Sequence, residues 1–108
     1  MSSAKLFHSF FQKEPSITTS AHGRVNLIGE HTDYNNGFVL PSLIPQSLQV
    51  SVNLRDDDKI IGISSDFGEL QSPISSSNDG TWLDFVKGAI YFCQKISPSI
   101  KGMEVAVS

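Results

Sequence analysis

Four polar side chains that could bind a substrate lie close together in the first third of the chain. Arg24 comes first, and Glu30 and Asp33 follow as two carboxylates with His31 between them. Ionised carboxylates accept several hydrogen bonds, which suits the neighbouring hydroxyls of a sugar. Arginine presents a fixed positive charge on a planar fork, which suits a phosphate or charge developing on one. These residue types therefore fit a polyol together with a phosphoryl group.

Other interpretations of the same residues remain open on chemistry alone. Glu30, His31 and Asp33 could ligate a metal ion, although no further His or Cys follows at the spacing of a zinc site. The two acids could form a glycosidase pair, but two acids on one short loop rarely flank a scissile bond. They could also be surface charges on a capped turn. Residue chemistry by itself does not choose among these interpretations.

The elements around this cluster are expected to be a strand and a tight turn. Residues 17–28 read as an extended stretch that leads into Gly29 and the polar residues. Turn-forming residues follow, and Asn36-Gly37 is a strong tight-turn signal because both residue types tolerate positive φ. A strand that ends in a loop is a common scaffold for functional groups.

The rest of the first half is expected to contain one helix and two strands. Apolar residues recur on one helical face over residues 6–11, Ser2 or Ser3 can cap the start, and Pro15 is expected to end the helix. Residues 46–54 alternate apolar and polar side chains, which predicts a strand with one buried face. Residues 59–64 are expected to return as a second strand. The aspartates at 56–58 lack metal-loop spacing, which favours a polar hairpin tip.

The second half is expected to contain a loop, a long helix and a final strand. Residues 72–80 read as a loop, and a long amphipathic helix is expected over about 81–97, where Thr81 and Asp84 resemble a capping box. Cys93 lies in its apolar stripe and is expected to be buried. Residues 102–108 alternate like a strand, and a chain that ends inside a regular element indicates a fragment. The predicted fold class is α+β with mixed and antiparallel strands.

Composition excludes several classes of partner. The chain has 108 residues, of which 39% are hydrophobic, and a formal net charge of −3, so we expect one globular unit and no nucleic-acid or membrane partner. The uncharged run at 38–54 contains prolines and glutamines and is too short to span a membrane. One cysteine allows no internal disulfide. We therefore expect a cytoplasmic protein.

The segment at residues 23–35 resembles the galactokinase signature. It reads Gly-Arg-Val-Asn-Leu-Ile-Gly-Glu-His-Thr-Asp-Tyr-Asn, and the similarity continues through residues 37–41. Residues 82–90 resemble the family's Trp-x-x-Tyr-x-x-Gly helix start, with Phe85 in the place of Tyr. Residues 102–107 resemble the strand that runs into the family's phosphate loop. His22 and Asn36 depart from the usual residues, but both only flank the motif.

This resemblance implies the N-terminal portion of an ATP-dependent sugar kinase of the galacto-, homoserine, mevalonate and phosphomevalonate kinase superfamily. Such an enzyme uses ATP and Mg²⁺ to phosphorylate the anomeric hydroxyl of α-D-galactose. By resemblance, Glu30, His31 and Asp33 hold sugar hydroxyls, and Arg24 stabilises the transferring phosphate. Trp82 and Phe85 line the adenine side, although periodicity alone also fits Trp82 as a core residue.

The resemblance also implies a division of the chain. Residues from about 4 to 53 correspond to the galactose-binding signature segment, and those from about 54 to 108 to the start of the kinase N-terminal domain. The phosphate loop, the Mg²⁺ ligands and the catalytic base are expected beyond residue 108, so the fragment alone is expected to be inactive. Two alternatives remain: a galactose- and ATP-sensing regulator without catalysis, and a kinase for a related sugar. The intact signature argues against the second.

Overall fold

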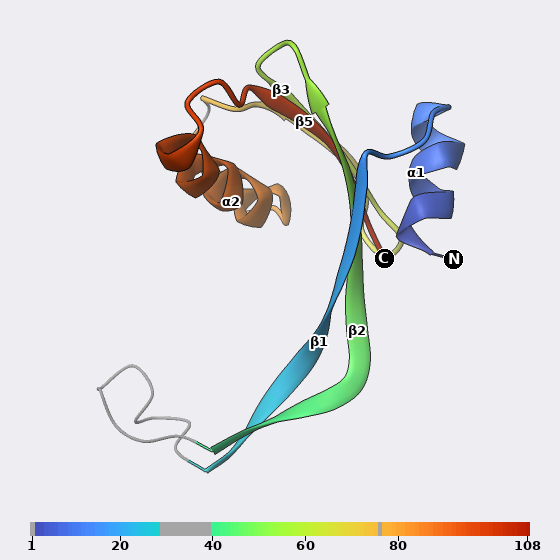
Figure 1. Ribbon diagram of the computed structural model, residues 1–108, viewed down its shortest axis with the longest axis vertical. Coiled ribbons are helices and arrows are strands. Elements are labelled where there is room, and N and C mark those ends of the chain that lie inside the picture. Colours follow the sequence, from blue (N-terminus) through green and yellow to red (C-terminus); the bar gives the residue numbers. More distant parts are fainter. Residues whose placement is uncertain (1, 29–39, 76) are drawn as a thin grey trace.

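The computed structural model describes residues 2–28, 40–75 and 77–108. These residues form α1 (Ser3–Phe11), β1 (Ile17–Ile28), β2 (Leu40–Arg55), β3 (Lys59–Ser64), β4 (Gly68–Pro73), α2 (Leu83–Ile96) and β5 (Gly102–Val107). The strands form one mixed sheet in the order β1-β2-β5-β3-β4. Helix α1 lies on one face and α2 on the other (Figure 1). The α+β fold class is confirmed.

Strand β5 lies in the centre of the sheet. It pairs antiparallel with β2 and parallel with β3. The expected hairpin between residues 46–54 and 59–64 is therefore wrong in its pairing, because β5 separates the two strands. Strand β4 was not predicted: no element was expected for residues 68–71, and the expected loop at 72–80 included the end of this strand. Strand β4 forms an antiparallel pair with β3. Alternation within each strand could not reveal this order, which depends on long-range pairing.

Both helices bury one face against the sheet. On one side Ile60, Leu83 and Ile90 form a buried cluster between β3 and α2. On the other side Phe7 of α1 is fully buried, as is Ala106 of β5. Apolar residues at helical spacing thus pack against alternating strand residues, as the sequence pattern predicts.

Helix α1 begins as expected but ends earlier. The backbone N–H of Lys5 donates to Ser2 Oγ at 3.2 Å, which confirms the serine cap. The helix ends at Phe11 because Gln12 adopts the left-handed conformation with φ of 59°. Pro15 therefore lies beyond the helix end and does not cause it.

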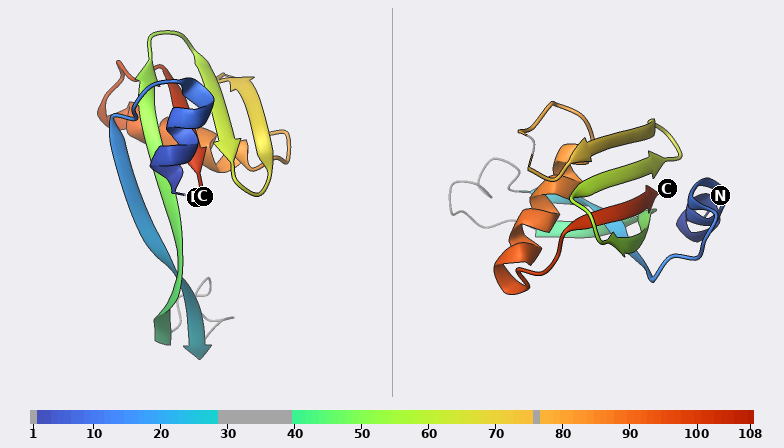
Figure 2. Two further views of the ribbon diagram at one scale, coloured as in Figure 1. Left: turned by 90° about the vertical axis from the view of Figure 1, so that its right-hand side faces the viewer. Right: turned by 90° about the horizontal axis from the view of Figure 1, so that it is seen from above.

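Strands β1 and β2 extend well beyond the other strands. Strand β2 pairs with β5 only from Val50 to Arg55, whereas its pairing with β1 runs from Leu40 to Val52. The far half of β1 and β2 is therefore a two-stranded ribbon. This ribbon curves toward the side of the sheet that carries α2 (Figures 1 and 2). None of the helices in the described part of the chain is long and apolar enough to cross a membrane.

Candidate functional site

The predicted sugar-binding residues follow β1 in the sequence. Glu30, His31 and Asp33 lie outside the described residues, so their roles stay predictions. Arg24 is described and lies on β1, opposite Leu43 of β2. Its side chain is exposed, and no carboxylate within the described ranges forms an ion pair with it.

The pairing of β1 with β2 is irregular next to Arg24. The pairing of β1 with β2 shifts register between His22 and Arg24, and a bulge re-aims the side chains that follow it. Gly23 lies in the bulge, where a Cβ atom would come within 2.9 Å of the Cδ1 atom of Ile44. His22 Nδ1 lies 3.1 Å from the carbonyl oxygen of Ile44. The Ile44 side chain therefore occupies the space that a side chain at residue 23 would need.

Several large apolar side chains of the ribbon are exposed among the described residues. They are Val25, Leu27, Leu43 and Leu48. Leu43 pairs with Arg24, so it lies on the opposite face of the ribbon from Val25 and Leu27. The exposed apolar side chains are therefore divided between the two faces of the ribbon.

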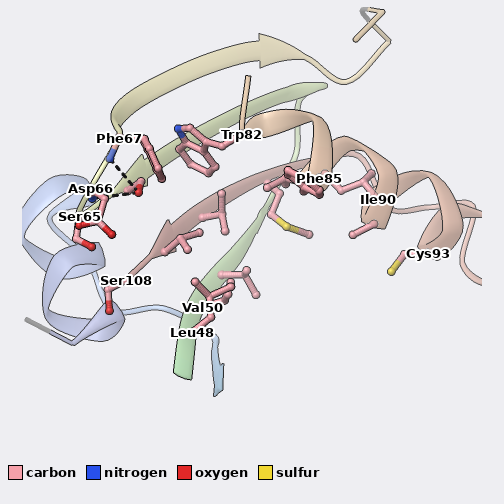
Figure 3. A pocket seen from close by; sticks show the side chains of 17 residues that line it. Leu48, Val50, Ser65, Asp66, Phe67, Trp82, Phe85, Ile90, Cys93 and Ser108 are labelled. Atoms are coloured by element: carbon pink, nitrogen blue, oxygen red, sulfur yellow. Dashed lines mark hydrogen bonds between the residues drawn. The ribbon is translucent and has the colours of Figure 1, made fainter. Parts of the chain in front are cut away.

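An apolar cavity of about 530 Å³ lies between α2 and the sheet. Its floor consists of apolar side chains of β2 and β5, and its wall consists of α2 residues (Figure 3). The principal lining residues are Leu48, Val50, Val52, Val105, Val107, Trp82, Phe85, Val86, Ala89 and Cys93. An enclosure of this size and character fits a flat aromatic group.

The turn between β3 and β4 gives the cavity one polar corner. Ser64 Oγ accepts hydrogen bonds from the backbone N–H groups of Asp66 and Phe67, both at 3.2 Å. Ser65 and Asp66 also line the cavity on this side (Figure 3). Sequence reasoning missed this corner because no element was predicted between residues 64 and 72, so no turn was expected at 65–67. A serine that ends a strand just before Asp-Phe-Gly is the signal that could have indicated it.

Trp82 and Phe85 line the same cavity but differ in how far they are exposed. Trp82 is half-buried, and its Nε1 atom is buried without a hydrogen-bond partner among the described residues. Phe85 is 83% exposed and lies on the adjoining turn of α2. A buried donor without a partner is unusual in folded proteins and calls for a functional explanation. The structure thus places the two predicted nucleotide-side residues on one cavity. Arg24 does not line this cavity and lies in the ribbon instead.

The predicted burial of Cys93 on α2 is wrong. Cys93 was expected to be buried, but it is exposed and lines the cavity. The apolar stripe of α2 is wider than the part that β3 and β4 cover. Phe92 and Ile96 are also exposed on this helix. The helical period correctly predicted the stripe but not how much of it the sheet would cover.

The start of α2 is held by charged side chains rather than by the expected capping box. Trp82 is the N-cap residue and makes no side-chain cap hydrogen bond. Asp84 instead accepts from the backbone N–H groups of Asp79 and Gly80 at 3.2 and 2.9 Å. Hydrogen bonds from Thr81 lower the pKa of Asp79 below its ordinary value. These hydrogen bonds connect residues 79–81, which precede Trp82, to the first turn of α2.

A second polar cluster lies on the α1 side of the sheet. The Glu104 carboxylate is 4% exposed, lies 2.9 Å from Lys13 Nζ and accepts from Arg55 Nη1 at 3.0 Å. Arg55 also donates two hydrogen bonds to Asp57. This hydrogen bonding is the main reason that the pKa of Asp57 lies well below its usual range. Within the described ranges no group of His, Cys, Asp and Glu is arranged to hold a metal ion.

This cluster is structural and was not expected from the sequence. It ties the segment before β1 to the central strand, through Lys13 and Glu104. The aspartates at 56–58 thus do not form a metal site among the described residues, and one of them binds Arg55 instead. In the sequence, Glu104 resembles an ordinary exposed strand residue, because its partners Lys13 and Arg55 come from segments far away in the chain.

Comparisons with known proteins find similarity to galactokinases. Residues 5–54 match the family model described as the galactokinase galactose-binding signature. The chain is 37% identical over 112 aligned positions to a galactokinase of Actinobacillus succinogenes, covering 98% of this chain and 29% of that protein. It therefore spans less than a third of the length of that relative.

Solved structures give the same result for the fold. A galactokinase of Lactococcus lactis in complex with galactose superposes with a TM-score of 0.75 at 30% identity, over 96% of this chain and 29% of that one. A mevalonate kinase of Methanococcus jannaschii matches with a TM-score of 0.65 at 17% identity, over 85% of this chain and 32% of that chain. The second likeness concerns the fold alone.

Proposed function

Since the chain resembles the N-terminal portion of galactokinases in sequence and in fold, we propose that it forms the sugar-recognition part of an ATP-dependent galactokinase. The proposed reaction transfers the terminal phosphoryl group of ATP to the anomeric hydroxyl of α-D-galactose. The observation that carries this proposal is the match of residues 5–54 to the galactose-binding signature. The proposed location is the cytoplasm, where ATP is available.

The proposed sugar site is the loop that follows β1. Glu30, His31 and Asp33 would accept and donate hydrogen bonds to the hydroxyls of galactose. Carboxylates discriminate strongly between sugars that differ at one hydroxyl, because a misplaced hydroxyl leaves a charged acceptor without a partner. The galactose complex of the Lactococcus lactis protein supports this proposal, since that protein matches 96% of this chain.

Arg24 is proposed to stabilise the phosphoryl group during transfer. Its side chain is exposed, carries a fixed charge and has no ion-pair partner among the described residues. Preorganised cations near a transferring phosphoryl group stabilise the charge of the transition state. The guanidinium therefore contributes to turnover more than to sugar binding.

The apolar cavity is the proposed place of the adenine ring. Trp82 and Phe85 supply aromatic surface next to an apolar floor of Val50, Val52 and Val105. A flat aromatic ring gains from both burial and stacking in such a cavity. The residues that would hold Mg²⁺ and the phosphates are not proposed among the described residues, where no metal-binding cluster occurs.

Two substitutions in the protein that carries this chain test the assignment. Asp33→Ala is expected to lower kcat/KM for galactose roughly 30-fold, which corresponds to about 2 kcal/mol, because it removes a charge-assisted hydrogen bond. Arg24→Ala is expected to lower kcat while changing galactose affinity less than threefold. Lys5→Ala, an exposed change on α1, is the control and should alter neither parameter.

The outcomes separate the two roles. Isothermal titration with galactose measures affinity apart from turnover. If Arg24→Ala leaves kcat unchanged, its proposed role in phosphoryl transfer is wrong. If the wild-type protein binds galactose and glucose equally well, the proposed recognition by Asp33 is wrong.

A further inference from the structure

Gly62 of β3 lies directly beneath the indole of Trp82. A Cβ atom at this position would come within 2.6 Å of Trp82 Cη2, 3.0 Å of Leu83 Cδ2 and 3.2 Å of Val105 Cγ1. Real Cβ atoms hardly ever approach another heavy atom this closely. The absence of a side chain at residue 62 therefore creates the space that the edge of the indole occupies.

Glycine is otherwise a poor choice for this position. It weakens the interior of a strand because it loses more backbone entropy and packs no side chain. Gly62 pairs with Leu70 of β4 on one side and with Val105 of β5 on the other, so no strand edge explains it. In a strand interior, a glycine commonly marks close approach of another group. Here that group is Trp82.

The depth of the indole in turn sets the shape of the cavity. Trp82 and Phe85 form the α2 side of the cavity, facing the apolar floor of the sheet (Figure 3). The Nε1 atom of Trp82 has no hydrogen-bond partner among the described residues, so the ring position depends on packing against β3. A methyl group at residue 62 would push the indole outward and narrow the cavity.

We propose that Gly62 is a positioning residue for nucleotide binding, which acts by seating Trp82 at the depth that a purine base requires. This inference rests on the proposed function of the cavity as the adenine site. It concerns a residue of β3 that lies outside the galactose-binding signature at residues 5–54. Gly62 itself need not touch the nucleotide, since it is covered by the indole.

The test compares Gly62→Ala with Gly88→Ala in the protein that carries this chain. Gly88 lies in α2, and a Cβ atom there would meet nothing within 4 Å. Gly62→Ala is expected to raise KM for ATP on the order of tenfold, because overpacking displaces a neighbouring side chain. KM for galactose should change less than twofold, and Gly88→Ala should leave both values near wild type.

Fluorescence gives a readout that does not depend on activity. Trp82 is the single tryptophan of the 108-residue chain, and subtracting the spectrum of a Trp82→Phe variant isolates its emission. Gly62→Ala is expected to shift this emission to longer wavelength, as the indole moves toward solvent. Gly88→Ala should cause no shift.

A rescue variant distinguishes positioning from a general loss of fold. Phenylalanine does not reach as far as the Cη2 atom that Gly62 accommodates, so Gly62→Ala should change KM for ATP less than threefold in the Trp82→Phe background. If Gly62→Ala unfolds the protein, recovery of the fold by Trp82→Phe supports the inference, and failure to recover overturns it. Unchanged emission together with unchanged KM for ATP in Gly62→Ala also overturns it.

The result that would contradict the proposed function differs from the one that would contradict the role of Gly62. A wild-type protein without galactose-dependent use of ATP contradicts the kinase assignment. A normal wild-type enzyme in which Gly62→Ala and Gly88→Ala behave alike contradicts only the role of Gly62.

Discussion

Glu104→Gln is the substitution that probes the buried charge cluster most sharply. The carboxylate is 4% exposed and contacts Lys13 Nζ at 2.9 Å and Arg55 Nη1 at 3.0 Å. Glutamine keeps the size of the side chain and one acceptor oxygen. It removes the negative charge and directs an NH₂ group at one of the two cations. The change therefore isolates the electrostatic contribution from packing.

The expected magnitude follows from the exposure of the two partners. The Lys13 side chain is 51% exposed, so its ion pair is expected to contribute about 0.5 kcal/mol. The Arg55 side chain is 24% exposed and donates a charge-assisted hydrogen bond, for which about 1.5–2.5 kcal/mol is expected. Glu104→Gln should thus lower the free energy of unfolding by about 2–3 kcal/mol.

Urea unfolding followed by circular dichroism measures this loss. Glu14→Gln is the matched control, because the Glu14 side chain is 78% exposed and lies 3.6 Å from His8 Nε2. The control should change the free energy of unfolding by less than about 0.5 kcal/mol. Equal stability of the two variants would refute the reasoning that the Glu104 cluster anchors the segment before β1.

Two further predictions concern neighbouring polar groups. Ser51 Oγ lies 2.8 Å from both Ser3 Oγ and Thr18 Oγ1, so Ser51→Ala should lower the free energy of unfolding by about 1–2 kcal/mol in the same urea titration, and no loss would show that these hydroxyls do not stabilise the fold. The pKa of Asp57 is lowered from 3.8 by hydrogen bonds from Arg55, so its stabilising contribution is complete above about pH 4 and is lost as the pH falls further. The melting temperature measured from pH 5 to pH 2 should therefore fall less steeply in Arg55→Gln than in wild type, and identical slopes would contradict this coupling.

Local patterns predicted most of the elements but not their arrangement. Residues 17–28, 59–64 and the strand from 102 have the bounds expected from alternation and turn residues. The central position of β5 was not predicted, because pairing between Val105 and Gly62 depends on contacts that no local period encodes. Strand β4 was missed for a related reason. Its stability comes from pairing with β3 rather than from β propensity, which is weak for its sequence.

The roles predicted for the site residues stay predictions, but the positions of two of them can be compared with the structure. The spacing of Trp82 and Phe85 correctly indicated one face of α2, and the structure places both on one cavity. The depth of the Trp82 ring could not be predicted, because it depends on the missing side chain of Gly62 on another element. Burial of Glu104 likewise depends on Lys13 and Arg55, which approach it only in the folded chain. The loop residues Glu30, His31 and Asp33 stay predictions.

The most direct test of the proposed function is to identify the product that the protein carrying this chain forms from galactose and Mg-ATP. Phosphorus nuclear magnetic resonance distinguishes a phosphate on the anomeric carbon from one on any other hydroxyl. The account predicts that galactose 1-phosphate accumulates and that glucose yields no product. A protein that binds galactose but forms no sugar phosphate, or one that phosphorylates both sugars equally, would contradict it.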